Sequence, residues 1–313
     1  MREPSVGDSS PLRLRVRGSA CRLNEGIVMI LVTGATGNIG RLVVELLLAD
    51  GEKVTAVTRN PAAAALPGDA HVVDGDPSRP TTLTSLLEGV GAVLISPRAL
   101  GDATAGAATS ELLAQAAEQG VERVVALSAA TVAYPAGYAR FAEAFKAVEN
   151  AVKASGLQWT ILRSTDYASN VLAWAPQIRS TGVVRGAYAD AATSTIHERD
   201  VAAVAVRALL NPTHAGQAYL LSGPESLSQR DKVRLIGEAI GTELSFEELP
   251  PEQIHQAMLA QGLPEDVPDR LLGSLADYVK QPGPSSHTVA TVLGRPALTF
   301  AAWAAEHAAA FQN

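Results

Sequence analysis

The stretch that decides the fold is MILVTGATGNIG, residues 29–40, in which an apolar run leads directly into a glycine-rich turn. Apolar residues then recur at helical spacing as far as Leu47, and Asp50-Gly51 marks the end of that helix. In this order of strand, turn and helix, main-chain N–H groups at a helix N-terminus can bind a diphosphate. The glycines serve three needs: a turn without side chains, close approach of the ligand, and tight packing of helix on strand.

Cofactor choice is predicted at the end of the next strand, residues 54–58, where Arg59 stands in place of an acid. A guanidinium can bind a 2′-phosphate, whereas a carboxylate at this position would repel it. NADP(H) is therefore favoured. Asp76 follows the third strand and is a candidate for the adenine amino group, although a turn or a helix cap explains it nearly as well. The residues expected at the cofactor are Gly34, Thr36, Gly37, Asn38, Ile39, Gly40, Arg59, Asp76, Ser96 and Ser128.

Short apolar runs alternate with helical stretches along the rest of the chain, which predicts parallel crossovers and an α/β fold with a Rossmann-like doubly wound sheet. The expected strands are 29–33, 54–58, 71–73, 92–95, 123–127, 159–162 and 218–221. The expected helices are 39–47, 83–87, 111–119, 140–154, 201–210 and 229–240. Residues 249–279 are expected to be helical, interrupted by Pro264 and Pro268, and to form a small, mostly helical C-terminal cap.

Three regions are therefore predicted. Residues 1–28 form a disordered leader, 29–165 the NADP-binding Rossmann core, and 166–313 a C-terminal part that returns strands and helices to the core and forms the substrate cap.

Composition narrows the class of protein. Hydrophobic residues make up 47% of the 313 residues but aromatic residues only 4%, which suits helices packed on a parallel sheet. A net charge of −7, with no basic cluster after Met29, argues against nucleic-acid binding. The single Cys21, the lack of metal-ligand spacing and the lack of an apolar run of membrane-spanning length favour a cytoplasmic protein without metal. A homodimer is compatible with the sequence.

From residue 29 onward the chain resembles the NmrA-like, atypical short-chain dehydrogenase/reductase family. The resemblance rests on GATGNIG (34–40), VTRNP (57–61), SGLQWTILR (155–163) with Asn170, IHERDVA (196–202), LSGPE (221–225) and LGRP (293–296). It implies a Rossmann domain with a small C-terminal cap and NADP(H) between them. Members of the family are reductases or redox-sensing regulators.

The chain departs from that family at its acid–base pair. Family enzymes that keep the pair carry Tyr-x-x-x-Lys with a glutamate four residues beyond the lysine, and counting back from Glu149 gives Phe141 and Phe145 here. Neither side chain can move a proton, and Lys146 is displaced by one residue, about 100° around a helix. The remaining candidates for a catalytic proton donor are the hydroxyl groups of Ser128, Tyr134 and Tyr138.

Aromatic residues are expected to shape the substrate pocket. The expected pocket residues are Phe141, Phe145, Asn170 and Trp174, the last two by resemblance alone. The two phenylalanines are equally well explained as core. His197 titrates in the range of an acid–base catalyst, but Asp200 follows it at the start of a helix, so we interpret the pair as a structural cap.

Hydride transfer depends on orientation more than on side-chain chemistry, so the missing pair does not exclude a reductase. The sequence favours an NADPH-dependent reductase of a small apolar or conjugated substrate such as a quinone, enone or imine. Two alternatives stay open: an NADP(H)-sensing regulator without catalysis, and a non-redox lyase or isomerase of a biosynthetic pathway.

Overall fold

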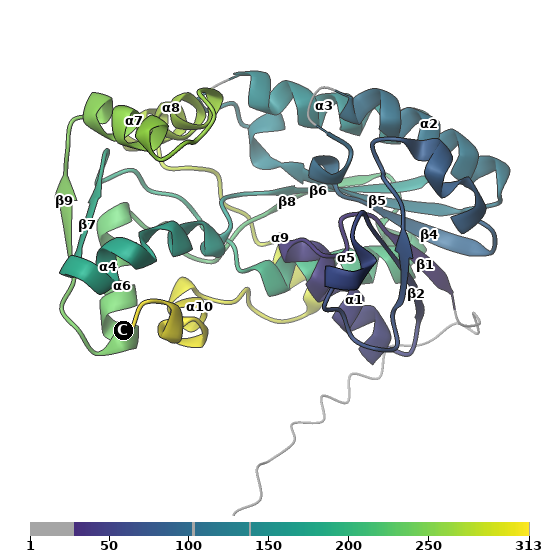
Figure 1. Ribbon diagram of the computed structural model, residues 1–313, viewed down its shortest axis with the longest axis horizontal. Coiled ribbons are helices and arrows are strands. Elements are labelled where there is room, and N and C mark those ends of the chain that lie inside the picture. Colours follow the sequence, from purple (N-terminus) through teal and green to yellow (C-terminus); the bar gives the residue numbers. More distant parts are fainter. Residues whose placement is uncertain (1–27, 102–103, 138, 313) are drawn as a thin grey trace, which may run out of the picture.

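A parallel sheet forms the centre of the molecule (Figure 1). The computed structural model describes residues 28–101, 104–137 and 139–312 of the chain, so the expected leader lies outside the described residues except for Val28. Within them the sheet has seven strands in the order β3-β2-β1-β4-β5-β6-β8, and every neighbouring pair is parallel. The strands are β1 (Met29–Val32), β2 (Lys53–Thr58), β3 (His71–Asp74), β4 (Val90–Ile95), β5 (Arg123–Ala129), β6 (Gln158–Ser164) and β8 (Gln217–Leu221).

Helices cover both faces of the sheet, which explains why the inner strands are apolar along nearly their whole length. On one face lie α1 (Asn38–Ala49), α5 (Glu198–Leu210) and α9 (Thr288–Leu293), which share a buried cluster with β1. On the other lie α2 (Ala105–Glu118) and α3 (Ala139–Ala154), packed with a second cluster. The resulting three layers are seen edge-on in Figure 1.

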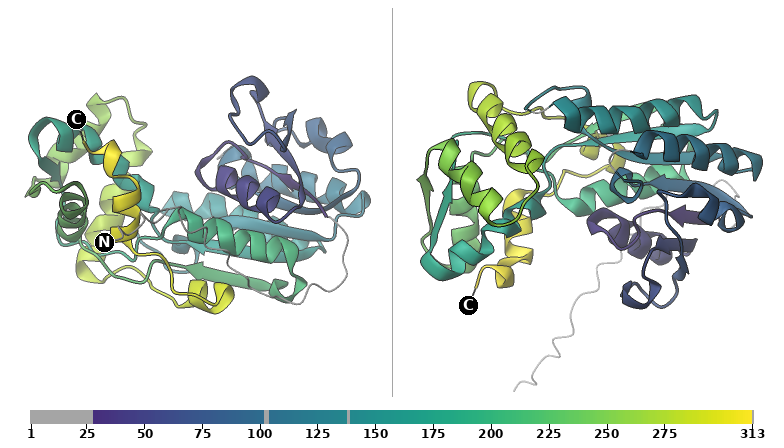
Figure 2. Two further views of the ribbon diagram at one scale, coloured as in Figure 1. Left: turned by 90° about the horizontal axis from the view of Figure 1, so that it is seen from below. Right: turned by 45° about the horizontal axis from the view of Figure 1, so that its top comes forward.

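The cap stands beside this core in both views of Figure 2, beyond the carboxyl ends of the strands. It consists of α4 (Ala175–Thr181), β7 (Val183–Gly186), α6 (Gln229–Ile240), β9 (Ser245–Glu248), α7 (Pro251–Ala260), α8 (Asp266–Lys280) and α10 (Phe300–Glu306). Most of these elements surround Trp303, which is fully buried. The hairpin of α7 and α8 is packed more loosely, since α7 has no buried residue.

The chain passes repeatedly between core and cap. It enters the cap after β6, returns with α5 and β8, leaves again to α6, returns to α9 and ends in α10. Asp200, in the first turn of α5, secures the last passage: its carboxylate accepts a 2.7 Å hydrogen bond from the Leu298 N–H and lies 2.7 Å from the Arg295 guanidinium.

The sheet and most of the expected helices agree with the sequence prediction. Helices α4, α9 and α10 were not predicted, and three further details differ. The stretch expected as a helix at 83–87 is a 3-10 helix, Pro80–Leu86. Pro268 does not interrupt a helix but lies in the first turn of α8, where a missing N–H costs nothing. The cap also contains the parallel pair β7–β9, which was not predicted. In the described part of the chain, no helix is long and apolar enough to cross a membrane.

We expect Asp200→Ala to lower the free energy of unfolding by about 3 kcal/mol, because it leaves the partly buried Leu298 amide and the Arg295 guanidinium without their acceptor. Asp200 is fully buried. Urea denaturation followed by circular dichroism measures the change. Asp190→Ala is the control. The Asp190 carboxylate is exposed and forms a surface ion pair with Arg230 at 3.5 Å, so its loss should change stability little. Equal effects of both substitutions would contradict the role given to Asp200.

Candidate functional site

The glycine turn lies where the strand order reverses, between β1 and β4, the position at which open α/β sheets form a crevice. Gly34 has φ +64°, and a Cβ there would lie 2.8 Å from the Cβ of Ser96 at the end of β4. A Cβ on Gly40 would overlap the carbonyl oxygen of Gly34. Only glycine at these positions lets α1 begin directly against β1.

The N-terminus of α1 has no acceptor of its own. Its N-cap, Gly37, makes no side-chain hydrogen bond, and the first turn holds no acid. Thr36, Gly37 and Asn38 are exposed, whereas Ile39 is buried in the core and can offer a ligand only its main chain. The Gly37 N–H donates to the Gly34 carbonyl oxygen at 2.9 Å, and the other exposed amides of the turn, with the positive end of the helix dipole, fit a diphosphate.

Asn38 also connects this turn to the cap. Its Nδ2 donates a 2.7 Å hydrogen bond to Oγ of Ser169, and the Ser169 N–H donates at 2.7 Å to the buried carboxylate of Glu198. The glycine turn is thus tied to the first segment of the chain that leaves the core. No sequence pattern indicates this contact, because the two residues are far apart in the chain.

Arg59 and Asp76 occupy different settings. Arg59 is exposed directly after β2 and has no hydrogen bond or ion pair with other described residues, so its guanidinium is available to a ligand. The Asp76 carboxylate instead accepts hydrogen bonds from Ser78 (2.7 and 3.1 Å) and Arg79 (3.0 Å). These bonds, that from the Ser78 hydroxyl foremost, lower the pKa of Asp76. The Asp76 carboxylate thus stabilises its own turn, and its contact with adenine remains a prediction.

Ser128, expected both at the cofactor and as a catalytic proton donor, is buried at the end of β5 and donates a 2.7 Å hydrogen bond to Glu149 on α3. Glu149 also accepts bonds from Arg163 at 2.8 and 2.6 Å and lies 3.2 Å from Lys153. Burial raises the pKa of Glu149, but the bonds from Arg163 and Ser128 outweigh it and the net pKa is lowered. The Ser128 proton is therefore directed at a buried carboxylate, and its catalytic role remains a prediction.

The other hydroxyl candidates are less constrained. Tyr134 is 48% exposed, just beyond the 3-10 turn after β5, and Tyr138 lies outside the described residues. The rings of Phe141 and Phe145 stand where the acid–base pair was expected and meet edge to face with centroids 5.0 Å apart. The Arg270 guanidinium of α8 lies 4.4 Å from the Phe141 centroid, so this aromatic pair faces the cap.

Asn170 and Trp174, the two pocket residues expected by resemblance, lie in different surroundings. Asn170 is exposed in the segment between β6 and α4. Trp174 packs edge to face on Phe246 of β9, with ring centroids 6.5 Å apart, within the cap. Both remain predictions as pocket residues. The structural interpretation of His197 is confirmed: it is the N-cap of α5, its Nδ1 accepts from the Arg199 N–H, and burial lowers its pKa.

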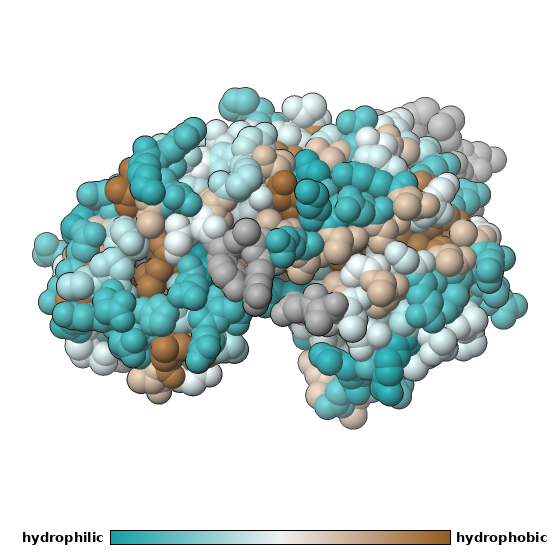
Figure 3. All heavy atoms as spheres, turned by 90° about the horizontal axis from the view of Figure 1, so that it is seen from above, coloured by the Kyte–Doolittle hydropathy of each residue, from teal (hydrophilic) through white to brown (hydrophobic). Residues whose placement is uncertain are grey.

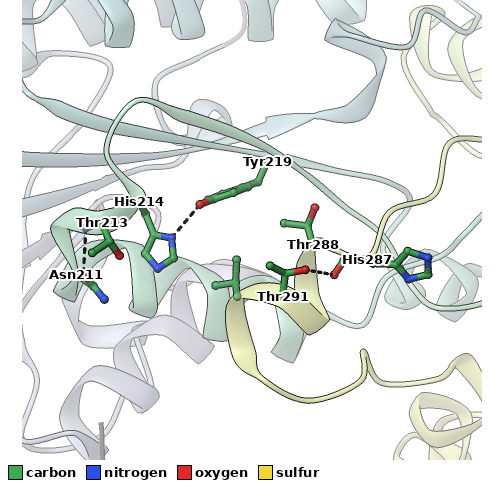
Figure 4. A pocket seen from close by; sticks show the side chains of 8 residues that line it. Asn211, Thr213, His214, Tyr219, His287, Thr288 and Thr291 are labelled. Carbon is green, nitrogen blue, oxygen red and sulfur yellow. Dashed lines mark hydrogen bonds between the residues drawn. The ribbon is translucent and has the colours of Figure 1, made fainter. Parts of the chain in front are cut away.

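The surface is hollowed between cap and core, as Figure 3 shows. A separate open pocket of about 520 Å³ lies at the outer edge of β8, where the Nδ1 of His214 and the hydroxyl of Tyr219 are 3.0 Å apart (Figure 4). It is lined by α9 and by the turn before β8, four strands away from the glycine turn. The candidate cofactor site is therefore the glycine turn beside the hollow and not this pocket. In the described residues no cluster of His, Cys, Asp and Glu is arranged to hold a metal ion.

Helix α6 carries a candidate functional residue that was not predicted, although its sequence contains the signal. The buried positions Gln229, Val233 and Ile236 recur at helical spacing, and Lys232 falls on the same face. Its side chain is buried beside Asp166, just after the end of β6. A lysine on an apolar helix face is unusual enough to mark a candidate functional group.

Comparison with known proteins identifies this architecture. Residues 34–212 match the family model described as NAD(P)H-binding. The (4-alkanoyl-5-oxo-2,5-dihydrofuran-3-yl)methyl phosphate reductase of Streptomyces griseus is 39% identical over 290 residues, which cover 90% of this chain and 99% of that protein. The NAD(P)H azoreductase of Xenophilus azovorans is 35% identical over 290 residues, with coverage of 90% and 99%.

Among solved structures, the NADPH-dependent quinone oxidoreductase of Escherichia coli in complex with NADPH superimposes with a TM-score of 0.77 at 26% identity, covering 89% of this chain and 99% of that one. The expected fold is confirmed. The triphenylmethane reductase of Citrobacter sp. complexed with NADP(H) shares the fold, with a TM-score of 0.77 at 18% identity.

We expect Glu149→Gln to lower the free energy of unfolding at pH 7 by about 2 kcal/mol or more, because Arg163 loses a buried ionic partner. Since the pKa of Glu149 lies below its ordinary 4.5, the wild-type advantage is fully present well above pH 4.5 and is lost as the pH falls through the lowered value. Denaturation curves at pH 7 and pH 4 test both statements. Glu143→Gln, an exposed change on the same helix, is the control, and a difference that grows at low pH would contradict this account.

Proposed function

The chain belongs to the NAD(P)H-binding family and is an NAD(P)H-dependent oxidoreductase with NADP(H) as its cofactor, and from this premise we propose that it reduces small conjugated substrates of the enone, quinone or imine type. The observation that carries the proposal is the aromatic pair Phe141 and Phe145, standing where a polar proton-transfer pair would be needed for simple carbonyl reduction. An apolar wall favours a flat, electron-poor substrate over a polar alcohol or sugar.

The chain's own residues bind and orient the reactants. The amides at the start of α1 hold the diphosphate, and Arg59 binds the 2′-phosphate of the ribose. When bound, the reduced nicotinamide supplies a hydride. Phe141 and Phe145 exclude water on the side of the cap, and the Glu149–Arg163 pair keeps α3, which carries them, against β5 and β6.

The substrates of the relatives support a conjugated acceptor. The furanone reductase acts on a ring whose C=C bond is conjugated with carbonyl groups, the azoreductase on N=N bonds, and the E. coli relative, 29% identical, on quinones. Their shared feature is a polarised π bond that accepts a hydride at one end. The Streptomyces and Xenophilus relatives are both named as reductases, which favours catalysis over the sensing role.

We expect NADPH oxidation, followed by the nicotinamide absorbance, in the presence of an acyl-substituted butenolide, 2-methylcyclohex-2-enone or a benzoquinone. The saturated ketone cyclohexanone should not be turned over, because its reduction places the full negative charge on an unconjugated oxygen. Product analysis should show a reduced C=C bond for the enones. NADPH binding without oxidation by any conjugated substrate, or equal turnover of cyclohexanone, would refute the proposal.

We expect Arg59→Ala to weaken NADPH binding about tenfold, the loss of one charge-assisted contact, and to leave NADH binding unchanged. Fluorescence titration of the reduced cofactors measures both constants. Arg234→Ala removes an exposed arginine of the cap and serves as the matched control. If Arg59→Ala left the preference for NADPH intact, the 2′-phosphate would have to be bound elsewhere.

A further inference from the structure

Lys232 is an anomaly in the cap. Its side chain is 4% exposed, although lysine is among the residue types least often buried. Burial lowers the pKa of Lys232, as expected for an ammonium removed from water. An ammonium has three donors, and such a group is retained in an interior only where charge and hydrogen bonds offset its desolvation.

The partners of Lys232 come from two segments that lie beyond the sheet. Its Nζ donates a 2.7 Å hydrogen bond to Oγ1 of Thr193 and lies 4.0 Å from a carboxylate oxygen of Asp166. Asp166 follows the end of β6 and is 39% exposed, so one side of this carboxylate faces away from the lysine. The buried ammonium is thus linked to the edge of the sheet at which ligands bind.

Tyr278 approaches the same cluster from α8. A Cβ placed on Gly283 would lie 3.3 Å from the Tyr278 ring and 3.6 Å from the Thr193 methyl group. The Tyr278 ring and the Thr193 side chain therefore both lie next to Gly283. Burial, together with the negative charges of Asp166 and Asp277, raises the pKa of Tyr278 to about 12. Its phenol is therefore protonated at neutral pH and available as a donor.

The orientation of α8 turns Tyr278 toward the core. Ser274 Oγ donates to the Ala136 carbonyl oxygen at 3.4 Å, and Asp277 accepts from the Gly137 N–H at 2.9 Å. Tyr278 comes four residues after Ser274 and directly after Asp277, so it borders the face of α8 that contacts the loop following β5. Leu275, three residues before Tyr278 and next to it on the helix surface, is buried.

We propose that Tyr278 is the proton donor of the reductase, and that Lys232 is a positioning residue that acts on it through Asp166 and Thr193. The inference rests on the proposed reduction of conjugated substrates. It supplies from the cap a tyrosine and a lysine, near the carboxyl end of β6, in place of the pair whose positions on α3 hold Phe141 and Phe145.

The chemistry balances for an enone. Its β-carbon gains a hydride from the reduced nicotinamide, and the C=C π pair shifts to give an enolate. The O–H bond of Tyr278 then breaks, its proton forms a C–H bond at the α-carbon, and the phenolate recovers a proton from water. Lys232 offsets the charge of Asp166, which would otherwise oppose the phenolate.

Tyr278→Phe tests the donor with two acceptors and NADPH. With 2-methylcyclohex-2-enone we expect kcat to fall about a hundredfold, the usual contribution of a general acid. With benzoquinone the loss should be less than about threefold, because the hydroquinone anion takes its proton from water. Tyr219→Phe, the same chemical change at the distant β8 pocket, is the control and should leave both rates unchanged. NADPH affinity, measured by fluorescence, should be unaltered in both variants.

A second readout does not depend on how well a variant folds. When the wild-type reaction runs in D₂O, deuterium should enter one face of the α-carbon, because a fixed phenol delivers it. Residual product of Tyr278→Phe should carry it on both faces. Unselective labelling by the wild type, an unchanged kcat of Tyr278→Phe on the enone, or equal losses on both acceptors would overturn the assignment. If the wild type reduced neither acceptor, the proposed function itself would fail.

Thr193→Val tests the positioning role of Lys232 without deleting the charge, since it removes only the hydroxyl that receives the ammonium. We expect kcat on the enone to fall about tenfold with KM and NADPH affinity unchanged, the pattern of an interaction made in the transition state. A loss of thermal stability with kcat unchanged would show that Lys232 is purely structural and would overturn this part.

Discussion

The close approach of α1 to β1 is the constraint on which the rest of the structure depends. The helix can start one short turn after the strand only because residue 40 has no side chain to strike the Gly34 carbonyl. That geometry brings the amides of α1 to the edge of the sheet beside Ser96, and it places Asn38 within reach of Ser169. The candidate cofactor site and the contact with the cap therefore both depend on the close approach of Gly40 to the Gly34 carbonyl group.

Local patterns are sufficient to predict most of the sheet and several helices. The helix at 229–240 is predicted with the residue bounds that the structure has, because helical periodicity and the stop at Gly241 agree; the structure adds a capping box at Ser228. Contacts between distant segments are not predictable in this way. Nothing near Ser128 in the chain indicates that its hydroxyl bonds to Glu149, and nothing near Lys232 points to Thr193. The cofactor turn is local and predictable, whereas the substrate side depends on how cap and core meet.

Two buried charges illustrate how differently such groups can be used. Glu149 is surrounded by Arg163, Lys153 and a hydroxyl, so its charge is compensated and the cluster ties α3 to the sheet. Among the described residues, Lys232 has one hydroxyl acceptor and a carboxylate at 4.0 Å. A compensated pair is typical of a structural role. An incompletely compensated charge at a sheet edge is typical of a functional one.

The repeated passage of the backbone between core and cap limits how the molecule can admit a ligand. A two-lobed protein joined by one linker opens about a single hinge, but here several connections would have to bend together, and Asp200 clamps one of them. Helix α7 is less restricted, because it buries none of its residues, whereas the hydrogen bonds of Ser274 and Asp277 hold α8 against the loop after β5. Substrate entry should therefore proceed by local displacement of α7, while α8 and the rest of the cap stay in place against the core.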